Sequence, residues 1–231
     1  MEEVATQGGG LTRASDLIAM PVRHHYVADA SLSEKGLGYH LERTVFCDVN
    51  WQACMATGDV ERLLGQAARV AASKYVERIG KMTLGLIGPA KSARHANTIY
   101  LAPFGVKLLK IMGFSEFDSL PEEEACGEVS CGVESGFLAA RYAEREVRGR
   151  LIMRWFWDVV TEQEVFETEV RDYVPRLMGK RGRWWGRLFY RLTQVNFHKL
   201  VMWGYHWWVR KNRRELLLCA ARELEGKKLL T

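Results

Sequence analysis

Two side chains of this sequence stand where they could do chemistry, Arg43 and His198. Arg43 falls on the otherwise apolar side of the alternating segment Tyr39 to Val49, where a guanidinium needs an anion. That anion is either a ligand carboxylate or phosphate, or an internal acid such as Glu169. His198 could act as a general acid or base if it faces a cavity, although its neighbours place it on a cationic helix side. Arg43 and His198 are therefore the catalytic candidates that the sequence offers.

Beyond these two residues the sequence contains no specific catalytic motif. It has no Ser-His-Asp order, no paired-carboxylate signature, no phosphate-binding loop and no cluster of metal ligands. The five cysteines are an odd number at spacings that fit no metal template, which predicts reduced thiols. We therefore expect neither a metal nor another cofactor, and whether the protein catalyses a reaction stays open.

The charges of the chain are unevenly distributed. Between Tyr173 and Asn212 there is no Asp or Glu, but there are nine Lys or Arg residues and five of the eight tryptophans. A segment of one charge sign that is rich in aromatic residues needs a partner for its charges or its rings. The alternatives are acids elsewhere in the chain, an anionic ligand, a phospholipid surface and nucleic acid. Nucleic acid is disfavoured because no recognised binding motif frames these cations.

Length and composition fit one compact unit. With 231 residues and 48% hydrophobic content, the chain is sufficient for a packed core. Residues 1–20 are polar and glycine-rich, so we expect a disordered leader followed by a single domain over residues 21–231. No signal peptide is visible, and the longest apolar run is too short to span a bilayer. The expected location is the cytoplasm, with or without contact at a membrane surface.

Periodicity predicts a mixture of helices and antiparallel strands. Tyr39 to Val49 alternates as a strand, and a helix with Asp59 as its N-cap follows as far as Ile79, with Gly80 as its stop. Residues 92–112 show helical spacing, whereas residues 21–35 are typical of a loop. Three further segments alternate as strands: 127–134, 150–160 and 165–174. The last two are predicted to pair as a hairpin.

A long helix is predicted from about Arg183 onward. Its first part places Trp184 and Leu188 on one face. A cationic stripe lies opposite them, made of Lys180, Arg183, Arg187 and Arg191. After Lys199 apolar residues occupy every side of the helix, so this half must be covered from more than one direction.

Three stretches of the sequence carry a family likeness. They are the strand Tyr39 to Val49 with the helix after it; Phe117, Leu120, Gly127, Glu128, Val129 and Gly132; and Phe166 to Arg171 with Arg187 to Tyr190 and Phe197-His198. On these short motifs, residues 39–215 resemble the START-like superfamily of polyketide cyclases, dehydratases and lipid-transfer proteins. The resemblance implies a helix-grip fold of class α+β, in which a curved antiparallel sheet grips a long C-terminal helix, here with a helical insertion after the first strand. It implies a pocket and not a particular reaction, because the superfamily has no universal catalytic residue.

The implied cavity lies between the sheet and the terminal helix. Its expected ligand-binding residues are Arg43, Val45, Met153, Trp155, Trp157, Thr168, Trp184 and Leu188. Such aromatic walls suit a hydrophobic or aromatic small molecule, although each of these side chains could instead fill the core. We therefore expect binding, with or without conversion, of a small hydrophobic ligand. The alternative is a peripheral module whose basic, tryptophan-rich helix docks on an anionic membrane surface or a partner protein.

Overall fold

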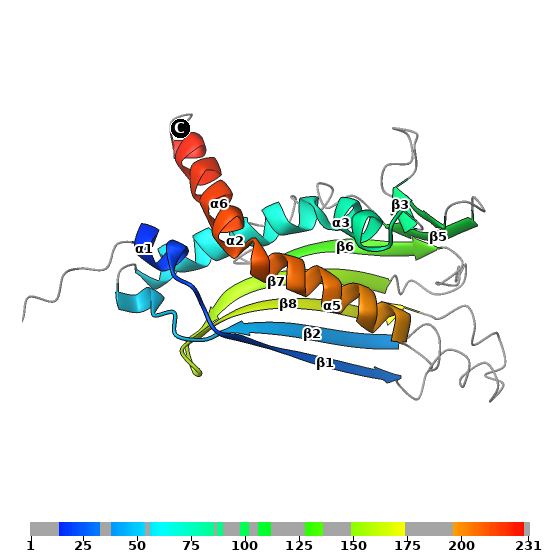
Figure 1. Cartoon of the computed structure of the whole chain (residues 1–231), viewed down its shortest axis with the longest axis horizontal. Helices are drawn as coiled ribbons and strands as arrows, with labels where there is room; N and C mark the ends of the chain where they lie inside the picture. The colour runs from blue at the N-terminus through cyan, green and yellow to red at the C-terminus, as the bar shows by residue number, and fades with distance from the viewer. Residues whose placement is uncertain are drawn as a thin grey trace, which may run out of the picture.

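A computed structural model describes residues 14–32, 38–53, 56–85, 87–89, 98–101, 106–111, 128–135, 149–173 and 196–228. Its strands form one antiparallel sheet of eight, in the order β1-β2-β8-β7-β6-β5-β4-β3 (Figure 1). The strands are β1 (His24–Leu32), β2 (Gly38–Phe46), β3 (Ile87–Pro89), β4 (Thr98–Leu101), β5 (Val106–Ile111), β6 (Glu128–Ser135), β7 (Gly149–Asp158) and β8 (Gln163–Tyr173). The described helices are α1 (Ala14–Ala19), the short 3-10 turn η1 (Trp51–Ala53), α2 (Thr57–Ser73), α3 (Tyr75–Met82), α5 (Asn196–Lys211) and α6 (Arg213–Lys228).

Helices α2 and α5 pack on the same face of the sheet, which we call the inner face. Helix α5 contacts β1 and β2, whereas α2 contacts β6 and β7. Tyr205 of α5 joins the two helices, because its hydroxyl donates to the carbonyl of Ala71 in α2 at 2.8 Å. Helix α6 packs on α2 and α1 and rises away from the sheet (Figure 1). This is the α+β arrangement that the sequence predicts, consistent with a helix-grip fold in which a C-terminal helix rests against an antiparallel sheet.

The hairpin of β7 and β8 confirms the strongest strand prediction. The two strands pair from Leu151 opposite Val170 to Trp157 opposite Glu164. Met153 and Trp155 are fully buried on the inner face, and this burial explains why large apolar residues recur at every second position of the sequence here. Strands β2 and β6 also lie where alternation predicted them.

Strand β1 occupies a segment whose sequence is typical of a loop. It pairs with β2 along its whole length, from His24 opposite Phe46 to Leu32 opposite Gly38. Its burial alternates, with Tyr26, Ala28 and Ala30 half-buried between exposed neighbours, but two of these three are alanines and the hydrophobic alternation is weak. Backbone pairing with the edge of β2 therefore determines this strand, and local sequence preference does not.

The prediction of a helical region over residues 92–112 is wrong for the described part. Residues 98–101 form β4 and residues 106–111 form β5, which extends the sheet beyond β6. Apolar residues three and four apart imitated a helix face here, but pairing with neighbouring strands overrides that spacing. The helical insertion after β2 therefore ends with α3 at Met82.

The helix predicted from Asp59 to Ile79 is two helices separated at Lys74. Asp59 is not the N-cap: Ala56 holds that position with an extended backbone and makes no side-chain cap hydrogen bond. Asp59 lies in the first turn instead, where its carboxylate offsets the positive end of the helix dipole. Gly80 lies inside α3 and does not stop it.

The predicted terminal helix is also divided. Residues 183–195, with Trp184, Leu188 and most of the cationic stripe, lie outside the described residues, as does Lys180. Helix α5 gives way to α6 at Asn212, whose side-chain amide donates to the carbonyl of Trp208 at 2.8 Å. At the other end of the chain, residues 14–19 of the predicted leader form α1, and its Leu17 and Ile18 are buried in the core.

One buried ion pair ties these terminal helices to the sheet. Arg213 of α6 donates to both carboxylate oxygens of Glu164 in β8, at 2.8 and 2.6 Å. The same carboxylate accepts the indole N–H groups of Trp51 at 2.8 Å and Trp155 at 3.0 Å. Arg213 also donates to the carbonyls of Leu17 and Ile18 in α1, so each group of this cluster has partners although both charges are buried.

The opposite face of the sheet, which we call the outer face, carries a second ionic network. Arg154 of β7 donates to Glu128, Glu167 and Glu169 at 2.6 to 2.8 Å. Glu167 and Glu169 of β8 therefore make cross-strand ion pairs with Arg154 of β7. Both acids are buried, with side-chain exposures of 5% and 9%.

Candidate functional site

Strand β2 turns its polar side toward the helices. His40, Glu42 and Thr44 alternate along the strand, so they share one face, and each is at most 1% exposed. They lie beneath α5, where Thr44 contacts His206 and Glu42 lies beside His198. The sequence suggested that the more apolar side of this strand would face the helices. Two histidines on α5 reverse that expectation because they supply partners for polar side chains in the interior.

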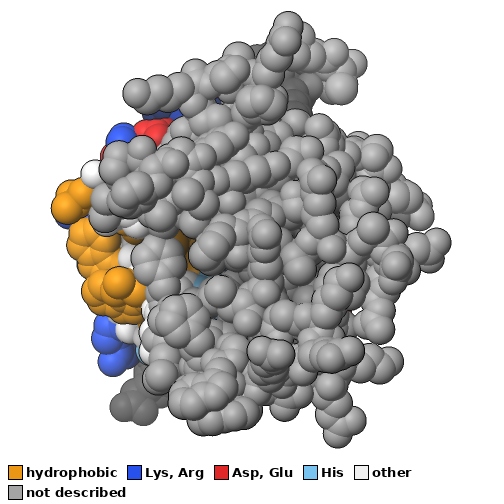
Figure 2. Space-filling model, turned by 90° about the vertical axis from the view of Figure 1, so that its right-hand side faces the viewer, with side chains coloured by type: hydrophobic (Ala, Val, Ile, Leu, Met, Phe, Trp, Pro, Cys, Tyr) orange, Lys and Arg blue, Asp and Glu red, His pale blue; other side chains and the backbone are white. Residues whose placement is uncertain are grey.

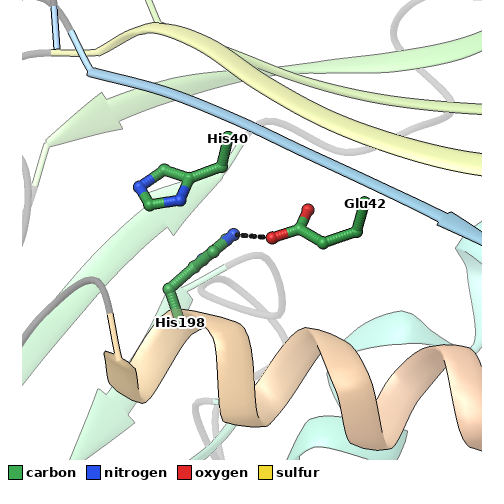
Figure 3. A group of neighbouring side chains, drawn as sticks. All are labelled: His40, Glu42 and His198. Carbon is green, nitrogen blue, oxygen red and sulfur yellow. Dashed lines mark ion pairs between the residues drawn. The ribbon is translucent and has the colours of Figure 1, made fainter. Parts of the chain in front are cut away.

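His40, Glu42 and His198 converge to form what we call the polar centre (Figure 3). His198 stands in the first turn of α5, with its Nε2 3.3 Å from Glu42 Oε1. The rings of His40 and His198 lie 4.4 Å apart between centroids. The side chain of Glu42 is fully buried, whereas that of His198 is 24% exposed. Of the three side chains, His198 is the one nearest to the surface, although its Nε2 is itself buried.

A directed chain of hydrogen bonds leads to Glu42. Thr168 of β8 donates its hydroxyl to Glu42 Oε2 at 3.3 Å. A hydroxyl has one proton, so Thr168 must accept from Nε2 of His206, 2.9 Å away. Nδ1 of His206 then accepts the hydroxyl of Thr44 at 2.8 Å. The chain fixes the tautomer of His206 and holds one of the two Glu42 oxygens in place.

Burial sets the protonation states around this chain. Burial lowers the pKa of His206 to about 3, so its ring is neutral at pH 7, as the hydrogen bonds require. The pKa of His40 is likewise lowered to about 3 by burial, with smaller contributions from the nearby His198 and Lys199. Burial raises the pKa of Tyr26, and the negative charge of Glu42 adds to that rise. The two histidines are therefore neutral, and each can offer a ring nitrogen as an acceptor.

The predicted site residues divide between the two faces of the sheet. Thr168 lies on the inner face and belongs to the chain that reaches Glu42. Met153, Trp155 and Trp157 share this face but are buried within the core. Arg43 and Val45 lie on the outer face, where the guanidinium of Arg43 donates to Glu167 at 2.5 Å. Arg43 thus has an internal acid as its partner, the second of the two options that the sequence left open.

Sequence reasoning missed most of the polar centre. The alternation of Tyr39 to Val49 puts His40 and Glu42 on the side opposite Arg43 and Val45, which were expected to line the cavity. The available signal was a histidine pair on α5, His198 and His206, eight residues apart and so on one helix side. Only the fold shows that this side meets the polar face of β2.

Comparison with known proteins adds little to this geometry. No family model matches the chain, and no curated protein matches it either. Among solved structures, the chain is similar to CalU16 from Micromonospora echinospora, with 8% identity and a TM-score of 0.28, over 87% of this chain and 99% of that one. A similarity this distant brings no function with it.

Proposed function

We propose that this protein binds a small molecule at the polar centre of His40, Glu42 and His198. The observation that carries this proposal is the state of Glu42. Its side chain is fully buried, and its Oε1 lies 3.3 Å from His198 Nε2 but, among the described residues, receives no hydrogen bond. Buried polar atoms in folded proteins nearly always have a partner, and an unpaired one lowers stability by about 1–3 kcal/mol. A ligand that donates a proton to Oε1 would remove that penalty.

The chemistry of the polar centre restricts the ligand class. Oε1 of Glu42 accepts hydrogen bonds, so the ligand needs an O–H or N–H group at this point. A hydrophobic or aromatic remainder, as expected from the sequence, would extend on the solvent side of His198, because Met153 and Trp155 are already enclosed by protein. If the ligand is converted, Glu42 and His198 are the groups placed to move a proton to or from it.

A fragment screen by ligand-observed NMR on the whole protein tests this proposal. We expect binding fragments for the wild type, and we expect most of them to be lost in Glu42→Gln and His198→Gln. The matched control is Glu225→Gln, which makes the same chemical change on an exposed site of α6 and should keep every fragment. Unchanged fragment binding by a folded Glu42→Gln variant would contradict the proposal.

A second candidate function rests on the outward side of α5. Leu200, Trp203 and Trp207 are 64%, 52% and 44% exposed, and their spacing of three and four places them on one side of the helix. Helix α5 contains no acid, and Lys211 lies 5.1 Å from the ring of Trp207. Figure 2 shows exposed hydrophobic side chains gathered at one edge of the molecule beside Lys or Arg side chains. Exposed tryptophans with flanking cations favour docking on an anionic lipid surface.

Co-sedimentation with vesicles tests this second candidate. We expect the wild type to bind vesicles of phosphatidylcholine and phosphatidylglycerol at low salt, and to bind less as salt screens the cations over about 10 Å at 0.1 M. Replacing Trp203 and Trp207 with Ala should abolish binding, whereas Val160→Ala, at a turn residue that is 93% exposed, should not. Equal binding by the double variant would exclude α5 as the docking surface.

The cationic stripe of residues 180–191 lies outside the described residues, so this candidate rests on α5 alone. Within the described residues, no helix has both the length and the hydropathy to cross a membrane.

A further inference from the structure

We propose that His40, Glu42 and His198 bind a divalent transition-metal ion. The inference deepens the proposed function and rests on it, since the ion would be the group through which the polar centre holds its small molecule. Two imidazoles and one carboxylate are ligands that zinc, and other ions such as ferrous iron, take in proteins. No such site was expected from the sequence, because two ligands come from β2 and the third from a helix more than 150 residues later in the chain.

The distances between the ligand atoms suit a single ion. One ligand atom from each of the three side chains lies within 4.8 Å of the other two. Nε2 of His198 and Oε1 of Glu42 are 3.3 Å apart. Two ligands bound tetrahedrally at about 2.1 Å stand about 3.4 Å from each other, so this pair already has the separation that zinc would impose. The ring nitrogen of His40, within 4.8 Å of both atoms, would be the third ligand and would have to come within about 4.2 Å of each of them.

The surroundings of Glu42 supply an independent observation. Carboxylates that bind metals are themselves held by hydrogen bonds from neighbouring groups. Thr168, oriented by His206, holds Oε2 in this way and leaves Oε1 toward the histidines. Within the described part of the chain, Oε1 of Glu42 and Nε2 of His198 make no hydrogen bond, although both atoms are buried. The two atoms closest to the proposed ion position are thus the two that lack hydrogen bonds.

Three protein ligands leave a coordination position open. Zinc sites with three protein ligands keep a fourth position for water or substrate, whereas closed structural sites use four. Among the three ligands only His198 has an exposed part, so we place the open position on its side. A metal there would bind a carbonyl, carboxylate or hydroxyl of the small molecule, or lower the pKa of a bound water.

Calorimetric titration of the whole, metal-free protein with Zn²⁺ tests the inference. We expect one ion to bind with a dissociation constant below about 10 µM, an affinity of at least about 7 kcal/mol. Thr168 holds a ligand but does not bind the ion itself, so Thr168→Val should weaken zinc binding by about 10–100-fold. Glu42→Gln and His198→Ala remove ligands and should each weaken it by more than that. The control is His25→Ala, because His25 Nδ1 and Cys47 Sγ, 3.8 Å apart, form another pair that could capture zinc. It should bind as the wild type does.

A second measurement needs no variant. When Co²⁺ replaces Zn²⁺, the wild type should show strongly shifted proton resonances from two histidine rings and the visible absorption of a four- or five-coordinate ion. Shifted resonances from fewer than two histidines would overturn the inference. In the zinc titration, weak binding by the wild type would overturn it, and so would a folded Glu42→Gln variant that binds zinc as tightly as the wild type. The two proposals can fail separately. If the protein binds fragments in the presence of EDTA but does not bind zinc, the metal site is contradicted and the small-molecule site is not.

Discussion

Replacing Arg213 with Met is expected to lower the free energy of unfolding by about 3–5 kcal/mol, the usual result of removing one member of a buried ion pair. The loss of stability comes from the buried groups that lose their partner when the guanidinium is removed. Glu164 is fully buried, and without the guanidinium its charge would keep only the indole N–H groups of Trp51 and Trp155. The carbonyls of Leu17 and Ile18 would lose a donor as well, so the contact of α1 with the core should weaken. Urea unfolding, followed by tryptophan fluorescence, measures the change.

The neighbouring residue provides the control for this prediction. Arg214→Met makes the same chemical change one position along α6, at an exposed side chain, and should alter the free energy of unfolding by no more than about 0.5 kcal/mol. Adding Glu164→Gln to Arg213→Met should recover part of the loss, because the buried charge is then gone. A loss below about 1 kcal/mol for Arg213→Met would show that the pair is far more hydrated than its burial indicates.

The central strands could be predicted from the sequence because burial on one face leaves a visible alternation. Met153, Trp155 and Trp157 in β7 show this pattern, and the antiparallel hairpin follows from the short turn before β8. The edge strands could not be predicted in this way. Among the described side chains, the inward face of β1 carries only Tyr26, Ala28 and Ala30, and β4 and β5 follow strand pairing although their sequence has helical spacing.

The candidate site was hidden for a related reason. Alternation separates the two sides of β2 but does not say which one faces the helices. The hydrophobic rule points the Val45 side inward, whereas the structure buries His40 and Glu42 beneath α5. A polar strand face can be buried only if a partner supplies hydrogen bonds, and that partner, His206, is over 160 residues away. No local pattern contains this information.

The two buried polar clusters of the inner face differ in how many hydrogen bonds their carboxylate oxygens receive. At Glu164, both carboxylate oxygens carry two hydrogen bonds each from Arg213, Trp51 and Trp155. At Glu42, one oxygen is held by Thr168 and the other has no hydrogen bond from the described residues. The first cluster stabilises the fold by itself. In the second, Oε1 of Glu42 has, within the described part of the chain, only the contact with His198 Nε2 at 3.3 Å, so it can still accept a hydrogen bond.

Trp155→Ala is expected to lower the free energy of unfolding by about 3–5 kcal/mol, as large-to-small changes in a core do. The side chain is fully buried, its ring stacks on Phe46 with centroids 6.0 Å apart, and it meets Phe166 edge-on at 5.4 Å. Its indole N–H also donates to Glu164 at 3.0 Å. A pocket wall, the other role that the sequence allowed, would lose ligand binding with little loss of stability. Thermal melting beside the fragment screen distinguishes these roles.

Two further variants identify what Trp155 contributes. Trp155→Phe keeps most of the ring but removes the N–H group, and should cost about 1.5–3 kcal/mol for the lost hydrogen bond to a charged carboxylate, whose Oε1 keeps the bond from Arg213. Trp203→Ala removes the same side chain from an exposed position and should change stability by no more than about 0.5 kcal/mol. Because Trp155 and Arg213 both donate to Oε1 of Glu164, their effects should not add in a double variant. Strict additivity would mean that the two side chains act on separate parts of the core, and that Glu164 does not join them.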